Sequence, residues 1–235
     1  MLLYRNRPES ALAVYAHPDD ADMAAGGTLS LWAESGTRVR LIVVCDGAKG
    51  SHDANAVASE LAERRRQEME TAARLLGVAD VIAFGIGDGE VTNSAALRER
   101  LVAEVRAFRP QAVLAPDPTA TFFGGVYVNH RDHRELGWAV LDAVAPSAAM
   151  PLYFPQAGPA HQVSELFLSG THEPDVTVDI STVIDRKVAA VSAHISQVSD
   201  DAEWVRSAVL GRAEPVGRSA HVRYGEAFRR VELAR

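Results

Sequence analysis

Cysteine is almost absent from this chain of 235 residues, which contains Cys45 and no other. A single thiol cannot form an internal disulfide, and it excludes a zinc site built from four cysteines. Cys45 ends the apolar run 41–45, so we expect it to be a buried core residue and not a nucleophile. This sparing use of cysteine fits a reducing compartment, and the sequence predicts a cytoplasmic protein.

Long hydrophobic runs and an excess of positive charge are lacking too. No apolar stretch approaches the roughly 20 residues that span a membrane, and the first residues do not resemble a signal peptide. The chain has 24 basic and 31 acidic residues, and its net charge is −7. Its arginine run, at 64–66, has glutamates on both sides. Neither a membrane nor a nucleic acid is therefore an expected partner.

Apolar segments of strand length alternate with segments of helix length along most of the chain. Strands are predicted at 12–16, 39–45, 81–84, 112–115, 166–168 and 176–178, and helices at 22–35, 57–76, 94–108, 131–144 and 181–197. The tail from 200 to 235 shows helical patches alone. Such an alternation favours right-handed crossovers and a mostly parallel sheet. The sequence predicts an α/β fold, a single Rossmann-like domain over residues 1–235 with helices flanking the sheet.

A histidine and two carboxylates follow the first predicted strand directly. The segment 16–20 reads Ala-His-Pro-Asp-Asp, and Pro18 keeps His17 in an extended conformation at the strand end. Asp19 and Asp20 diverge where a helix begins, so that one can bind a metal while the other faces substrate. A simple helix cap would explain one aspartate, but neither the histidine nor the second acid.

A second polar cluster, His130-Arg-Asp-His133, lies more than a hundred residues further on. His130 and His133 share one face of a predicted helix, and Asp132 can hold the proton of a histidine. Two polar histidines on an exposed turn are the alternative. In an open α/β sheet, ligands bind beyond the carboxyl ends of the strands, so we expect the two clusters to meet there.

These residues resemble the zinc-dependent PIG-L/LmbE-like N-deacetylases, which remove acetyl groups from N-acetylglucosamine-type substrates. The resemblance extends over roughly 11–197, and the two histidine motifs are its specific part. Its further pieces are Gly26-Gly-Thr28, Asp46-Gly47, Arg65-x-x-Glu68, Leu76-Gly77, Asp117-Pro118 and Lys187-x-x-Ala-x-x-x-His194-x-Ser-Gln197.

The resemblance implies a ligand set and a set of catalytic roles. It assigns the metal to His17, Asp20 and His133, with Zn²⁺ as the usual ion and Fe²⁺ as an open alternative. Asp19 would be the general base, and His130, held by Asp132, the general acid or electrostatic stabiliser. The substrate-binding residues would be Arg65, reaching sugar hydroxyls, and His194, lining the pocket rim or simply facing outward from a helix.

One departure and several alternatives stay open at this stage. Many family members have glutamate directly after the two aspartates, whereas this chain has Ala21 followed by Asp22. The expected partner is a small amino-sugar or amide, and homo-oligomers are left open. The same site would also suit an amidase for a larger thiol conjugate or an acylated natural product, or a metal-binding or sugar-binding module without turnover. The loop 119–128 and the tail after 200 are expected to shape the substrate mouth.

Overall fold

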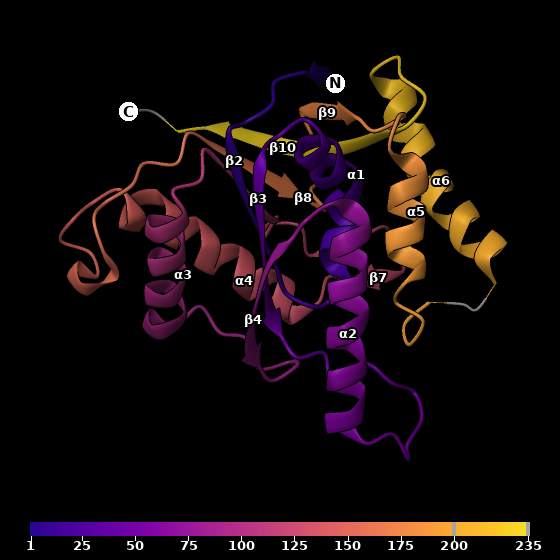
Figure 1. Ribbon diagram of the computed structural model, residues 1–235, viewed down its shortest axis with the longest axis horizontal. Helices are drawn as coiled ribbons and strands as arrows, with labels where there is room; N and C mark the ends of the chain where they lie inside the picture. Colours follow the sequence, from indigo (N-terminus) through magenta and orange to yellow (C-terminus); the bar gives the residue numbers. More distant parts are fainter. Residues whose placement is uncertain (199–200, 234–235) are drawn as a thin grey trace.

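The computed structural model describes residues 1–198 and 201–233, and a single eight-stranded sheet forms its centre (Figure 1). The strand order is β1-β9-β10-β8-β5-β2-β3-β4. Five neighbours, from β8 to β4, run parallel, and β10 is antiparallel to both β8 and β9. The strands of this sheet are β1 Leu2–Tyr4, β2 Ser10–Tyr15, β3 Arg38–Cys45, β4 Asp80–Ile86, β5 Ala112–Pro116, β8 Glu165–Ser169, β9 Val176–Asp179 and β10 Gly225–Glu232.

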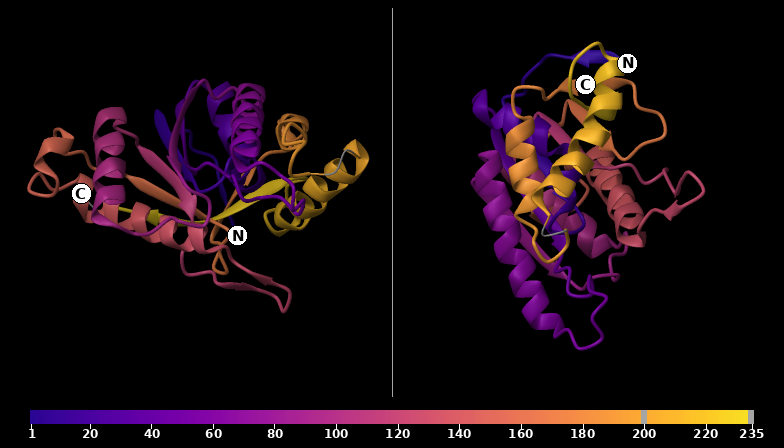
Figure 2. Two further views of the ribbon diagram at one scale, coloured as in Figure 1. Left: turned by 90° about the horizontal axis from the view of Figure 1, so that it is seen from below. Right: turned by 90° about the vertical axis from the view of Figure 1, so that its right-hand side faces the viewer.

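Helices cover both faces of the sheet. On one face α1 packs against α2 and α5, and α5 packs against α6; on the other, α3 packs against α4 (Figure 2). A hydrophobic core lies under each group of helices. The helices are α1 Asp20–Glu34, α2 Ala58–Leu76, α3 Ala95–Phe108, α4 Arg131–Asp142, α5 Ile184–Ser192 and α6 Ala202–Ser219, with a kinked segment at Ala143–Ala148 and a 3₁₀ turn at Pro155–Ala157. The predicted α/β class with a mostly parallel sheet is confirmed.

The chain order places a topological switch point beside β2. From β2 the chain passes outward through β3 to β4, and it then returns to β5 on the other side of β2. Crevices that bind ligands form beyond the carboxyl ends of strands at such a point. His17 therefore follows one of the two strands, β2 and β5, whose carboxyl ends border this switch point.

Several local predictions agree with the structure. Gly77 ends α2 in the left-handed conformation, with φ of +81°, and the Ser94 side chain accepts a hydrogen bond from the Leu97 N–H at the start of α3. Cys45 is buried, and this burial raises the pKa of its thiol to about 11. The expectation that Cys45 is a core residue is confirmed.

The structure corrects the end of the chain. The helix predicted at 181–197 is shorter, because the Ser181 hydroxyl bonds the Asp179 carboxylate at 2.6 Å and the helix starts only at Ile184. The tail predicted as helical patches contains α6 and also β10, a strand inside the sheet; residues 200, 234 and 235 lie outside the described residues. Strand β1 was also not predicted.

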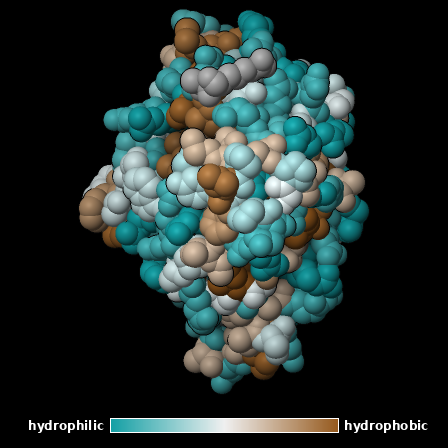
Figure 3. All heavy atoms as spheres, turned by 90° about the vertical axis from the view of Figure 1, so that its left-hand side faces the viewer, coloured by the Kyte–Doolittle hydropathy of each residue, from teal (hydrophilic) through white to brown (hydrophobic). Residues whose placement is uncertain are grey.

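A short two-stranded hairpin, β6 Phe122–Phe123 and β7 Tyr127–Val128, projects from the body of the molecule (Figure 2). It lies within the loop predicted at 119–128. On the face shown in Figure 3, which is the left-hand side of Figure 1, hydrophobic residues form separate small patches among hydrophilic ones. Within the described part of the chain, no helix has the length and apolar character needed to cross a membrane.

The buried ion pair between Lys187 and Glu226 forms hydrogen bonds with the backbone of α1. The Glu226 carboxylate accepts hydrogen bonds from the backbone N–H groups of Gly27 and Thr28, at 2.9 and 2.7 Å. The ammonium of Lys187 pairs with Glu226 and donates to the Met23 carbonyl at 2.9 Å. In a regular helix the Met23 carbonyl and the Gly27 N–H are each other's partners. The Gly-Gly-Thr motif and the lysine of the late motif thus belong to one buried contact.

Replacing Lys187 with methionine should lower the free energy of unfolding by about 3 kcal/mol or more, because the change leaves a buried carboxylate without its counter-ion. Urea unfolding followed by circular dichroism measures this value. The matched control is Arg186→Met on the same helix, which removes an exposed ion pair with Glu34 and should cost at most about 1 kcal/mol. Equal losses in the two variants would contradict the role given to the buried pair.

Candidate metal centre and pocket

The two histidine motifs meet at the carboxyl end of β2. His17 follows β2, Asp20 opens α1 and His133 lies in the first turn of α4. His17 Nδ1 is 3.2 Å from His133 Nε2, and the Asp20 Oδ2 atom is 3.3 Å from the former and 3.0 Å from the latter. Two ring nitrogens and one carboxylate oxygen therefore converge on a single point.

These distances fit a metal. Ligands of a tetrahedral zinc ion, with bonds of about 2.0–2.1 Å, lie roughly 3.3–3.4 Å from one another. The three atoms are already within a few tenths of an ångström of that spacing. Two neutral imidazoles and one carboxylate also leave a divalent ion with net positive charge and an open position. The fold brings together His17, Asp20 and His133, the residues to which the resemblance assigned a metal.

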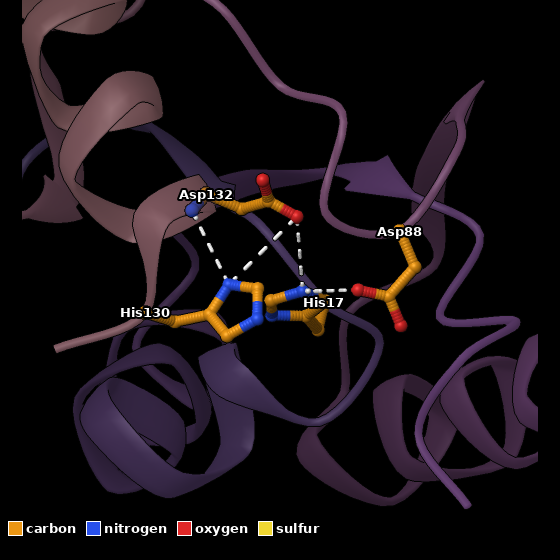
Figure 4. A group of neighbouring side chains, drawn as sticks. All are labelled: His17, Asp88, His130 and Asp132. Carbon is orange, nitrogen blue, oxygen red and sulfur yellow. Dashed lines mark hydrogen bonds and ion pairs between the residues drawn. The ribbon is translucent and has the colours of Figure 1, made fainter. Parts of the chain in front are cut away.

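The other nitrogen of His17 faces two carboxylates, as Figure 4 shows. His17 Nε2 is 3.2 Å from Asp88 Oδ1 and 3.4 Å from Asp132 Oδ2. Burial opposes a charge on the ring, but the hydrogen bonds with Asp132, Asp20 and Asp88 raise the pKa of His17 far above its usual range. The two carboxylates beside Nε2 hold a proton on that nitrogen, so that Nδ1 is the nitrogen that would bind a cation in place of its own proton.

The position of the Asp132 side chain is fixed by burial and by hydrogen bonds with the backbone. It has no exposed surface, and it accepts hydrogen bonds from the backbone N–H groups of Gly89 and Val91 at 2.7 and 3.3 Å. Burial alone would favour its neutral form, but the hydrogen bonds with His17, Gly89 and Cys45 lower the pKa of Asp132 to about 2. Asp132 is therefore an ionised residue.

His17, Asp88, His130 and Asp132 are also close enough together to form a second metal-binding group. Two observations favour the first. His133 has its other nitrogen, Nδ1, 3.1 Å from Asn129 Oδ1, so both imidazoles of the first group are backed by an oxygen acceptor, as metal-binding histidines usually are. In the second group, His130 Nδ1 already accepts a hydrogen bond from the Asp132 N–H at 3.2 Å.

Asp19 directly precedes Asp20, a member of the first group, at the start of α1. Its side chain is 26% exposed, and its Oδ1 accepts a hydrogen bond from Arg65 Nη2 at 2.8 Å. The Arg65 residue is only 3% exposed, and its Nη1 donates to the Gly47 carbonyl at 3.0 Å. The sequence predicted that Arg65 would reach sugar hydroxyls. In the structure its guanidinium instead donates hydrogen bonds to Asp19 and to the Gly47 carbonyl. Arg65 lies among the buried residues of α2, a helix that packs against α1 and α5.

His194 lies in the interior, which corrects its predicted place at the pocket rim. It has no exposed surface, and its Nε2 is 2.7 Å from the Asp22 carboxylate. Burial alone would lower the pKa of His194, but the hydrogen bond with Asp22 raises it. Asp22 is the acid found where the sequence departs from the family pattern. Two residues further on, Ser196 donates to the Glu68 carboxylate with its N–H at 2.9 Å and its hydroxyl at 2.6 Å, which joins the late motif to α2.

The sequence prediction left out two residues of the site. Asp88 lies in the glycine-rich turn after β4, and Asn129 directly precedes the second histidine motif. Polar residues that follow parallel strands lie at one edge of the sheet, and Asp88 follows β4. The sequence could therefore have predicted Asp88 as a site residue. Nothing in the sequence pattern singles out Asn129 as a support for His133.

A pocket of about 470 Å³ opens beside the candidate ligands Asp20 and His133. Its volume lies in the range usual for small-molecule sites. The projecting hairpin contributes Phe123 and Tyr127, and α6 contributes Arg212. The remaining lining residues are Tyr15, Met23, Ala24, Pro116, Asn129, Ser169 and Gly170. Both segments that were expected to shape a substrate mouth, the 119–128 loop and the tail, thus line this pocket.

Fold and site together define an α/β protein with a candidate metal centre at its topological switch point. The family described as PIG-L, GlcNAc-PI de-N-acetylase, matches residues 12–144, which is more than half of the chain. This protein belongs to the PIG-L family. The family resemblance stated from the sequence is confirmed.

Individual relatives agree with this assignment. The chain is 34% identical to the diacetylchitobiose deacetylase of Thermococcus kodakarensis over 83% of its own length and 73% of the relative's. It is 30% identical to a probable N-acetyl-alpha-D-glucosaminyl L-malate deacetylase 2 of Bacillus cereus, over 79% and 82%. The solved N,N′-diacetylchitobiose deacetylase of Pyrococcus horikoshii, an inhibitor complex, is 32% identical, with a TM-score of 0.87 over 96% of this chain and 84% of that one.

The two overlapping groups around His17 predict different effects on metal content. We expect His133→Ala to lose tightly bound Zn²⁺, since the change removes one of three ligands. His130→Ala should retain close to one ion per chain. Mass spectrometry of the dialysed, zinc-loaded proteins measures the stoichiometry. Loss of the ion in His130→Ala, with retention in His133→Ala, would place the metal in the second group.

Proposed function

We propose that this protein is a zinc-dependent N-deacetylase that hydrolyses the acetamide of an N-acetylglucosamine-type sugar. The observation that carries the proposal is the convergence of His17 Nδ1, Asp20 Oδ2 and His133 Nε2 at 3.0–3.3 Å, next to the partly exposed Asp19. The substrate class is supported by the two relatives above, which are deacetylases of N-acetylglucosamine-type sugars by name. Two histidines and one carboxylate suit both zinc and iron(II), and zinc is proposed because it is the ion that the family resemblance implies.

The metal would be held by His17, Asp20 and His133. When bound, a Zn²⁺ ion supplies a water that is acidic near neutral pH and polarises the amide carbonyl. The proton transfers are carried out by the protein's own residues. Asp19 accepts a proton from the attacking water, and Arg65 fixes the direction of its carboxylate through the 2.8 Å contact. Asp19 then returns that proton to the amine as the carbon–nitrogen bond breaks, which gives acetate and a free amino sugar.

His130 stabilises the oxygen on which negative charge develops. Its Nδ1 accepts the Asp132 N–H, so the neutral ring carries its proton on Nε2. Burial lowers the pKa of His130, which favours this neutral form. A neutral imidazole aimed at an oxyanion acts as a hydrogen-bond donor. In this proposal, Asp132 positions the rings of both His17 and His130.

Acetate release from N-acetylglucosamine and N,N′-diacetylchitobiose tests the proposal directly. The zinc-loaded protein should release acetate, a chelator should abolish the release, and added Zn²⁺ should restore it, because the water is activated only when the metal is bound. An enzyme-coupled acetate assay provides the measurement. A fully zinc-loaded protein that releases acetate from neither sugar would contradict the proposed substrate class.

The role of Asp19 gives a separate test. Asp19→Asn should lower kcat by about 10²- to 10⁴-fold, the usual contribution of a general base, while the zinc content stays that of the unchanged protein. Steady-state kinetics and metal analysis on one sample provide both numbers. A matched control is Asp53→Asn in the exposed segment before α2, which should leave kcat unaltered. Full activity in Asp19→Asn would rule out its role as the base.

A further inference from the structure

The segment after α5 carries the late motif of the sequence, which has no part in the proposed chemical steps. Its side chains bond three separate elements. His194 contacts the first turn of α1, and Ser196 donates to a carboxylate on α2. Gln197 Nε2 donates to the Gly50 carbonyl at 3.1 Å, in the loop that follows β3. Asp19, its arginine partner and the carbonyl that binds this arginine lie in the same three elements.

The guanidinium of Arg65 is packed tightly against this loop. Its Nη1 donates to the Gly47 carbonyl and its Nη2 to Asp19, as described above. A Cβ atom on Gly47 would lie 2.6 Å from Nη1, and one on Gly50 would lie 2.7 Å from the same nitrogen. Glycine at both positions thus lets the loop backbone approach the charged group closely. A side chain at either position would have to displace the guanidinium, and with it the partner of Asp19.

Gln197 fixes Gly50 relative to the helix that carries Arg65. A Cβ atom on Gly50 would also lie 3.0 Å from Gln197 Oε1, so the side chains of Gln197 and Arg65 pack on the same side of this glycine. Gln197 Nε2 also donates to the Ser196 carbonyl at 2.9 Å, and the Ser196 hydroxyl is bonded to Glu68 on α2. The loop is therefore attached to α2 through Gln197 at the point where it meets the guanidinium.

We propose that Gln197 is a positioning residue for Asp19, the proposed general base. Gln197 holds the glycine loop against Arg65, and Arg65 holds the Asp19 carboxylate in the direction from which it takes a proton. The inference rests on the proposed deacetylase function and adds a residue that, within the described part of the chain, belongs to neither the pocket lining nor the candidate metal groups. A base acts only within hydrogen-bond reach of the proton, so displacement of the guanidinium should lower turnover while substrate binding and metal content are kept.

Gln197→Ala tests this role in zinc-loaded protein with N,N′-diacetylchitobiose as the substrate. We expect kcat to fall about tenfold or more, because a small misplacement of a reacting group can cost about a hundredfold, while KM and zinc content change less than about twofold. Gln197→Glu, which keeps the shape but replaces the donor facing the Gly50 carbonyl with an oxygen, should lower kcat as well. The matched control is Gln67→Ala, which removes an amide bonded to the exposed Glu63 and should leave kcat unaltered. A rise in KM with kcat unchanged would overturn the inference.

A double variant separates positioning from a general loss of structure. In protein that already carries Arg65→Met, the further change Gln197→Ala should have little effect on kcat, because its effect passes through the guanidinium. Losses that multiply in the double variant would show that Gln197 acts independently of Arg65, and they would contradict the proposal. Circular dichroism and zinc content establish that each variant is folded.

Crystal structures of the unchanged protein and of Gln197→Ala keep the inference separate from the proposed function. If the protein releases acetate from no acetylated sugar, but the contact between Arg65 and Asp19 is lost in Gln197→Ala, the deacetylase proposal fails and the positioning of Asp19 stands. If the protein is an active deacetylase and Gln197→Ala keeps either its kcat or this contact, the inference is wrong and the function stands.

Discussion

The position of one imidazole ring determines the rest of the site. His17 has both ring nitrogens in use: Nε2 faces the carboxylates of Asp88 and Asp132, and Nδ1 faces His133 and Asp20. These partners come from the ends of different elements, the turn after β4 and the first turns of α1 and α4. β2 lies between β3 and β5 in the sheet, and side chains from all these elements meet at the histidine that follows it.

The candidate metal group and part of the pocket wall come from different parts of the chain. The residues matched by the family, 12–144, contain the candidate metal group, Asp19 and the hairpin. Ser169, Gly170 and Arg212, which close the pocket, lie after them. A scaffold of this kind can keep the metal and the base fixed while the later elements change which molecules fit. This division agrees with a family whose named relatives act on different N-acetylglucosamine-type sugars.

Much of the fold was readable from the sequence because its central strands are fully buried. Apolar runs such as β2 and β5 have no polar interruptions, and their carboxyl ends carry the polar residues of the site. Strand β10 gave no such signal, since Arg230 and Glu232 interrupt it; Arg230 pairs with Glu165 on the neighbouring strand, a partner that local pattern cannot reveal. The two histidine motifs pointed to residues that the fold brings together as a candidate metal group. The buried positions of Arg65 and His194 could not be predicted, because they depend on contacts with Asp19 and Asp22 that form only in the folded chain.

The contact between Glu226 and α1 has a consequence for the order in which the protein matures. The N–H groups of Gly27 and Thr28 emerge early in synthesis, and their carboxylate partner emerges some two hundred residues later. On the ribosome the nascent chain can therefore form β2, β3 and the first helices well before α1 acquires its final support. The helix that begins at Asp20 acquires this contact only after Glu226 has left the exit tunnel.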